Sequence, residues 1–217
     1  MILEALIVSL KVAIPATILV TIVGVMLGRL LRGKSNWLSK LIETLIMLPL
    51  FMPPSLIGYV IIVALGKKSL IGGFLYNNLG FSLIFTVYGA ILATFVVALP
   101  IIYGTVKSAL ASVDIAYEEA AMDLGATKAQ AFYKVVLPMC YKQITGGVIL
   151  SFARAFGEFG ATMMVAGNIP GKTQTIPLAL YYSFEYGDNT KTSMLALVVL
   201  IISTTLIFIY NKVIKNK

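Results

Sequence analysis

The chain has no histidine and only one cysteine, Cys140, among its 217 residues. Without histidine it lacks the commonest general base and the commonest metal ligand, and a single cysteine cannot form an intrachain disulfide. No GxxxxGK[ST] segment occurs, so the glycine-rich phosphate loop that many ATPases use is missing. We therefore expect no metal site, no cofactor bound by this chain, and no ATP hydrolysis by that route.

Charged residues are also scarce. They make up 12% of the chain, against 59% hydrophobic residues, whereas globular domains contain about 25% charged residues. This composition predicts an all-α integral membrane protein, with one transmembrane domain over residues 1–217 and no soluble domain. The net charge of +8 comes from basic residues that flank apolar runs, which indicates membrane topology rather than nucleic-acid binding.

A membrane-spanning helix needs about 20 apolar residues. Five stretches are long enough, and we expect them to span the bilayer: 12–31, 44–65, 83–106, 143–166 and 192–211. The apolar stretch 176–186 is too short to cross, so we expect it at the interface or as a re-entrant piece. The first residues, MILEALIVSL, lack the basic segment and small-residue cleavage site of a signal peptide, so we expect a retained first span.

The basic residues predict the orientation of these spans. Five spans place the termini on opposite sides, and eleven Lys and Arg residues lie on the side of the C-terminus, against five on the other side. Cytoplasmic loops carry the excess of basic residues. We therefore expect a multi-pass protein of a prokaryotic plasma (inner) membrane, with its N-terminus outside and its C-terminus and loop 107–142 in the cytoplasm.

Loop 107–142 holds the densest cluster of acids in the chain, at Asp114, Glu118, Glu119 and Asp123. Asp114 is suited to cap a helix that starts at Ile115, and Gly125 supplies the left-handed residue that ends such a helix. A second helical stretch over 127–136 should stop at Pro138. The segment is either an amphipathic loop on the lipid headgroups or a helix–turn–helix that contacts a soluble partner.

The spacing within residues 119–138, EAAMDLGATKAQAFYKVVLP, resembles the coupling loop of permease subunits of bacterial ATP-binding-cassette importers. The matching residues are Glu119, Ala120, Ala121, Gly125, Val135, Leu137 and Pro138. The resemblance implies the type I permease fold of these importers and a coupling helix that docks in a cleft of a separate ATPase subunit. That partner would use the ATP, and its closure would push on this loop.

Breaks in the spans indicate more than lipid anchoring. The second span contains Pro53 and Pro54, and the fourth contains Gly157. Irregular backbone persists in a bilayer only where it is buried in protein or lines a wet cavity, and small residues also allow close helix packing. Tight packing and a role in lining a translocation pathway both remain open for these residues.

Arg154 and Glu158 lie four residues apart in the fourth predicted span, hence on one face of a continuous helix. Charges inside a membrane are costly, and they are usually paired or face water. The two side chains either form an ion pair that fixes the bundle, or Arg154 attracts an anion in the pathway while Glu158 keeps it from binding too tightly.

A second resemblance concerns the substrate. The segments PLFMPPSLIGY (49–59), GEFGAT (157–162) and GNIPGKTQTIPLALY (167–181) are similar to permeases for tetrahedral oxyanions: molybdate first, then sulfate and thiosulfate, and more distantly tungstate. The resemblance implies an extracytoplasmic substrate-binding protein that docks on the outer loops 66–82 and 167–191. Candidate contacts for it are Asn168, Lys172 and Gln174, although a plain exposed turn explains them equally.

These observations favour a permease subunit without catalytic activity. Five helices are few for a gated pore, and two copies would supply ten around one axis, so we expect a homodimer in the lipid bilayer. An integral membrane enzyme is disfavoured because histidine, a metal cluster and paired carboxylates within the spans are missing. A passive anion channel is the remote alternative, since a channel needs no ATPase-docking loop.

Overall fold

The computed structural model describes residues 2–215 of the chain, and it contains helices but no strand within that range. Three of the helices are long and apolar enough to cross a membrane, namely α1 (Ile2–Leu31), α5 (Val87–Ala111) and α12 (Asn189–Lys215). Two bent helix pairs raise the number of possible spans to five. The all-helical membrane fold is therefore confirmed, and the predicted five spans require that each bent pair be counted as one crossing.

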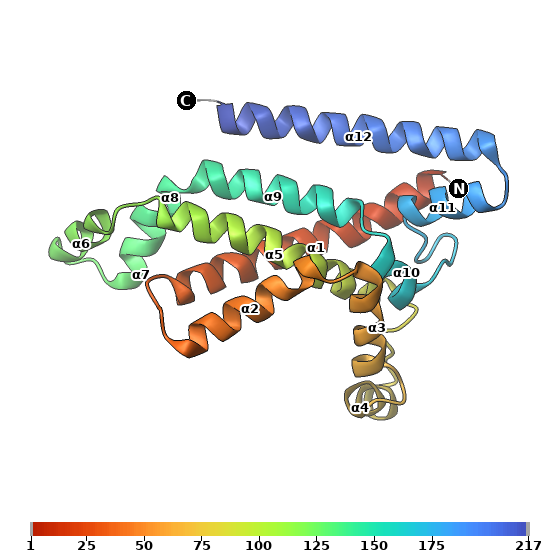
Figure 1. Ribbon diagram of the computed structural model, residues 1–217, viewed down its shortest axis with the longest axis horizontal. Coiled ribbons are helices and arrows are strands. Elements are labelled where there is room, and N and C mark those ends of the chain that lie inside the picture. The colour runs from red at the N-terminus through yellow and green to blue at the C-terminus, as the bar shows by residue number, and fades with distance from the viewer. Residues whose placement is uncertain (1, 216–217) are drawn as a thin grey trace.

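The bundle is built around α1 and α5, which pack along each other (Figure 1). Gly28 of α1 permits this approach, because a Cβ atom there would lie 2.5 Å from Cγ1 of Val106. Helix α1 begins at Ile2, so the predicted start at residue 12 was wrong. The reason is that Ala5 and Ala13 are buried in one cluster with Ile176 of helix α11 (Ile176–Glu185), which keeps the first turns helical.

The predicted second span, 44–65, is two helices rather than one. Helix α2 covers Trp37–Phe51 and α3 covers Pro54–Leu65, and their axes differ by 119°. Two consecutive prolines, Pro53 and Pro54, lack the backbone donors that a continuous helix needs at this point. Pro54 instead opens α3, where a free N–H is not required.

The predicted fourth span, 143–166, is also interrupted. Helix α9 (Tyr141–Phe156) ends before Gly157, and the short helix α10 covers Gly160–Ala166. The pair of helical segments Lys128–Met139 and Tyr141–Phe156 bends by 74°. This part of the chain therefore reaches the bundle through a bend and leaves α9 through a second break.

The second helical stretch of loop 107–142 was predicted to stop at Pro138, but it continues past this residue. It runs through α7 (Lys128–Ala131), the π-helical turn η1 (Phe132–Val136) and α8 (Leu137–Met139). Within the π turn the N–H of Leu137 donates to the carbonyl of Phe132, five residues earlier. The wider turn lets Pro138 enter the first turn of α8, where its missing donor is tolerated.

The remaining boundaries differ less. Helix α5 starts later than the predicted residue 83, because the Thr86 hydroxyl caps it by accepting from the N–H of Gly89. Helix α12 extends the predicted span 192–211 at both ends, and the short stretch 176–186 is helix α11. Helix α4 (Leu70–Leu79) was not predicted; it follows α3, and the two project from the side of the bundle (Figure 1).

The two ends of the bundle differ in what they gather (Figure 1). One end holds the last turn of α1, the first turn of α2, the loop helices and the last turn of α12. The opposite end holds the start of α1 together with α10 and α11. The first and last described residues, Ile2 and Lys215, therefore lie at opposite ends, as an odd number of crossings requires. Lys217, one of the eleven basic residues assigned to the C-terminal side, lies outside the described residues.

Candidate functional site

The loop helix α6 covers Ile115–Asp123 and starts and stops where its capping residues predict. The Asp114 carboxylate accepts a hydrogen bond of 3.0 Å from the N–H of Ala116. Gly125 has φ +90°, a left-handed backbone that residues with a Cβ atom rarely adopt. The predicted cap at Asp114 and the predicted glycine turn at Gly125 are therefore both confirmed.

The surface of α6 is open to solvent, because none of its residues is buried. Leu124, directly after the helix, is 89% exposed, and Ile115 and Tyr117 are exposed as well. Among the residues that match the coupling loop, Glu119, Ala120, Gly125 and Pro138 are exposed, whereas Ala121, Val135 and Leu137 are half-buried. Exposed apolar side chains on a projecting helix are typical of a protein-binding surface.

Helix α6 is tied to the end of α1 by one arginine. Nη1 of Arg32 lies 2.7 Å from Oε2 of Glu118, and Nη2 donates to the carbonyl oxygen of Val113 at 3.3 Å. The sequence analysis missed this ion pair, whose members are 86 residues apart. The sequence did contain a signal for this pair: the acid cluster of loop 107–142 and the basic residues at the end of the first span were predicted on the same side of the membrane.

A second arginine of α1 reaches the other half of the loop. The guanidinium carbon of Arg29 lies 5.1 Å from the ring centre of Phe132 and 4.9 Å from that of Tyr133. Contacts of this length between a cation and an aromatic ring are attractive. Arg29 in the last turn of α1 and Arg32 directly after this helix thus contact η1 and α6, so these segments are connected to the membrane bundle on two sides.

The two helix breaks lie next to each other. A Cβ atom on Gly160 would lie 3.2 Å from Cβ of Pro54, and one on Gly58 would lie 2.6 Å from Cβ of Met164. The starts of α3 and α10 are therefore in direct contact. Discontinuous membrane helices commonly form the binding sites of transporters, and the candidate pathway residues Pro53, Pro54 and Gly157 all lie at these two breaks.

Arg154 and Glu158 do not share a helix face, contrary to the prediction, because α9 ends at Phe156. Their side chains nevertheless meet: Nη1 of Arg154 lies 2.5 Å from Oε2 of Glu158, in an ion pair without hydrogen-bond alignment. The other carboxylate oxygen of Glu158 accepts from the N–H of Ala161 at 2.8 Å. Glu158 is only 2% exposed, so one buried carboxylate joins α9 to α10.

Arg154 is less enclosed than its partner. Its side chain is 32% exposed, whereas that of Glu158 is 1% exposed. The side chain thus keeps an accessible surface while its guanidinium is paired with one carboxylate. Both interpretations of the pair are compatible with this arrangement, since Glu158 fixes the bundle and also restrains Arg154.

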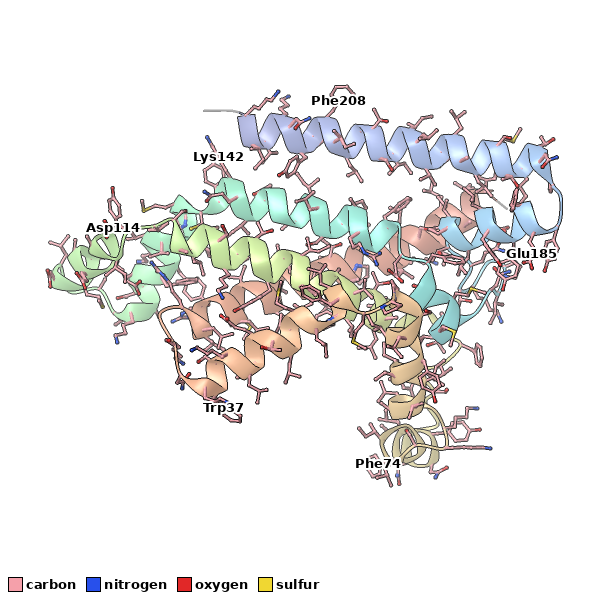
Figure 2. All side chains as sticks on the ribbon, in the orientation of Figure 1. Trp37, Phe74, Asp114, Lys142, Glu185 and Phe208 are labelled. Atoms are coloured by element: carbon pink, nitrogen blue, oxygen red, sulfur yellow. The ribbon has the colours of Figure 1, made fainter. Side chains whose placement is uncertain are left out.

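The candidate binding-protein contacts lie between α10 and α11, at the end of the bundle away from α6 (Figure 1). Nε2 of Gln174 donates to Oδ1 of Asn168 at 2.8 Å, and both side chains are half-buried, whereas Lys172 is exposed. Figure 2 labels Glu185 at this end and Asp114 at the opposite end. In residues 2–215, no three Cys, Asp or Glu residues group together in a way that could hold a metal ion.

Apolar helices, two adjacent breaks and a projecting loop with an open helical surface define a membrane transport subunit. Residues 20–216 match the family described as binding-protein-dependent transport system inner membrane component, and the chain belongs to that family. It is therefore a multi-pass permease of the inner membrane, a transport component and not an enzyme.

The chain is similar to several proteins that are named as transport system permeases. The chain is 40% identical over 200 residues to the putative molybdenum transport system permease protein YvgM of Bacillus subtilis, covering 92% of this chain and 88% of the relative. It is 38% identical over 196 residues to the molybdenum transport system permease protein ModB of Haemophilus influenzae, with coverages of 90% and 86%. A probable sulfate transport system permease protein of Chlorella vulgaris is 31% identical over 208 residues, with coverages of 96% and 78%.

Solved structures share the fold. An inward-facing MetNI methionine ABC transporter matches with a TM-score of 0.74 at 17% identity, covering 99% of this chain and 94% of that one. A bacterial ABC transporter that imports alginate matches with a TM-score of 0.78 at 13% identity, with coverages of 99% and 80%. At these identities the similarity supports the type I permease fold, and it gives no information about the substrate.

Proposed function

We propose that the chain forms the translocation pathway of an ATP-driven importer for a tetrahedral oxyanion, with molybdate as the leading candidate. The segments around residues 157–162 and 167–181 favour this substrate class, and so do the names of the molybdenum permeases with 38–40% identity. Sulfate, thiosulfate or tungstate is the alternative, which the sulfate relative keeps open.

One observation carries the proposal: a capped helix without a buried residue, α6, bears the coupling residues Glu119, Ala120 and Ala121 at one end of the bundle. A separate ATPase subunit would receive this helix in a cleft, and that subunit would bind and hydrolyse ATP. Gly125, Leu137 and Pro138 would set the geometry of the turn that follows. This chain itself would bind no cofactor.

The contacts of α6 suggest how movement of the ATPase reaches the pathway. A push on α6 is transmitted to α1 through the Arg32–Glu118 pair. The same push passes through α7, η1 and α8 into α9, whose far end is the break at Gly157. Because that break touches the start of α3, a rigid-body shift of α9 would change the spacing of the two breaks.

The breaks are the proposed pathway, with Pro53, Pro54 and Gly157 on it. The partly exposed Arg154 would supply the positive field that a dianion needs inside the membrane, and Glu158 would limit how tightly the anion is held. Two copies of the chain would enclose the pathway as a homodimer. The end that carries α6 would face the cytoplasm, with the N-terminus outside.

The opposite end would receive the substrate-binding protein at the loop that contains Asn168, Lys172 and Gln174. The Gln174–Asn168 hydrogen bond fixes the loop, and exposed Lys172 is suited to an acidic surface of the partner. A passive anion channel would need neither partner, so dependence on both separates the two functions.

The decisive experiment is uptake by vesicles that contain the permease, the ATPase and the binding protein. We expect ATP-dependent molybdate uptake that Glu119→Ala reduces strongly, with normal membrane insertion of the variant. Competition by tungstate and sulfate ranks the substrates. Uptake that persists without ATP, or that survives the Glu119 change, would contradict the importer and favour the channel.

Arg154→Met tests the pathway charge in the same vesicles. If Arg154 attracts the anion, a stable and well-expressed variant loses most of its uptake. Normal uptake by that variant would limit the pair to a structural role, and the expression level in membranes serves as the control.

A further inference from the structure

A cavity of about 420 Å³ lies at the end of the bundle that carries α6. It is bounded by the last turn of α1, the first turns of α2 and the last turns of α5. Its size falls within the range of about 300–1,000 Å³ that small-molecule sites occupy. Its charged lining residues are Arg32, Lys34, Lys40, Lys107 and a single acid, Glu43, so positive charge is in excess.

The single acid of the cavity is already occupied. Oε1 of Glu43 accepts from the Tyr103 hydroxyl at 2.9 Å, and Oε2 accepts from Nζ of Lys107 at 2.8 Å. Arg32 is engaged with Glu118, outside the cavity. The only acid in the lining, Glu43, therefore forms an ion pair with Lys107 and with no other basic residue of the cavity.

Lys34 and Lys40 have no acidic partner among residues 2–215. Both flank the start of α2, which has no acidic residue in its first turn. The N-terminus of a helix carries a partial positive charge and favours anions. Both lysines are exposed, so water screens their charges from each other, and an anion that enters the cavity would be attracted by both ammonium groups and by the start of α2.

We propose that this cavity is a binding site for a tetrahedral oxyanion group, held by Lys34 and Lys40. Ammonium groups bind such groups as point charges. The site depends on the proposed function only for the placement of this end in the cytoplasm. The group belongs either to the free oxyanion that leaves the pathway or to the phosphate of an anionic phospholipid.

A second cavity, of about 480 Å³, connects the site with the helix break. It shares Lys40 and Glu43 with the first cavity and follows α2 past Met47 to Phe51, directly before the break at Met52. Beyond Lys40 and Glu43 this groove is lined by Thr44, Met47, Leu48 and Phe51, so its surface is mostly apolar. The same groove could hold an acyl chain of a lipid whose phosphate occupies the site.

Direct binding tests the site in the nucleotide-free complex of this chain with its ATPase subunit, purified in neutral detergent without the binding protein. Radiolabelled molybdate in equilibrium dialysis is the probe. The double variant Lys34→Gln/Lys40→Gln is expected to bind about tenfold more weakly, because it loses both charge-assisted contacts. The control, Lys68→Gln/Lys191→Gln, removes the same charge from positions outside the cavity, one exposed and one half-buried, and should bind like the parent.

A lipid arm separates the two sources of the group. The complex is placed in nanodiscs of phosphatidylcholine, with or without phosphatidylglycerol, and retained phosphatidylglycerol is measured by native mass spectrometry. Molybdate binding that phosphatidylglycerol does not displace assigns the site to the free oxyanion. Phosphatidylglycerol retention that depends on both lysines assigns it to lipid phosphate.

The site is refuted if the double variant and the parent bind molybdate equally and also retain phosphatidylglycerol equally. Uptake measured in parallel keeps this outcome apart from a failure of the proposed function. Parental uptake of an oxyanion without binding at the lysines refutes the site alone. Absent parental uptake contradicts the importer, whatever the binding result.

Discussion

Glu118→Gln removes the negative charge of the ion pair that joins α6 to α1. The side chains of Arg32 and Glu118 are 17% and 23% exposed, so water screens the pair only in part. Exposed ion pairs contribute about 0.2–1 kcal/mol, and hydrogen bonds to charged groups about 1.5–3 kcal/mol. For a partly exposed pair that keeps a neutral hydrogen bond in the variant, we expect a loss of about 1 kcal/mol.

Helix α6 should show this loss locally, because none of its residues is buried. A loss of about 1 kcal/mol corresponds to about fivefold more frequent opening. Hydrogen–deuterium exchange with mass spectrometry should therefore show about fivefold faster exchange of the amides in residues 115–123. Transport per ATP hydrolysed should fall as well, since a loosened α6 transmits less of the movement of the ATPase.

The control is Glu185→Gln, which makes the same chemical change at an exposed glutamate at the opposite end of the bundle. It should leave the exchange of α6 unchanged. Exchange of residues 115–123 in the Glu118 variant within twofold of the parent would refute the reasoning that Arg32 holds this helix.

Two further changes test the packing and the turn. Gly58→Ala places a Cβ atom 2.6 Å from Cβ of Met164, so it should destabilise the contact of α3 with α10 by about 1–3 kcal/mol and lower the apparent Tm in detergent. Gly125→Ala forces a residue with a Cβ atom to φ +90°, at a cost of about 1–2 kcal/mol, and should speed exchange in α6 and reduce uptake. The control for both is Gly104→Ala, because no neighbouring atom lies within 4 Å of a Cβ atom built there. The explanation is contradicted if the Gly104 variant has a lower Tm or faster exchange in α6. It is also contradicted if the Gly58 variant keeps the parental Tm or the Gly125 variant keeps the parental exchange.

Local signals explain why the start of α6 at Ile115 and the turn that ends it at Gly125 could be predicted. Its start depends on the side chain of Asp114, and its end depends on the left-handed conformation of Gly125. Both are determined by residues within one turn, so they can be recognised without knowledge of the surrounding fold. The spans in α1, α5 and α12 could also be predicted, because each is recognised from one continuous apolar stretch of the sequence.

Contacts between distant segments could not be predicted in this way. Glu158 is compatible with a helix, and only its bond to the start of α10 and its contact with Arg154 reveal that α9 has ended. Helix α4 was missed because adjacent glycines and asparagines in residues 70–79 are typical of a loop. The meeting of Gly160 with Pro54 follows from the packing of two breaks that are far apart in the sequence.

Photo-crosslinking from α6 tests the central claim most directly. A benzoylphenylalanine in place of Leu124, which is 89% exposed, should form an adduct with the ATPase subunit in native membranes, identified by peptide mass spectrometry. The same residue in place of exposed Leu79 of α4 should not. Absence of the Leu124 adduct, or its formation with a protein on the outer side of the membrane, would contradict the account.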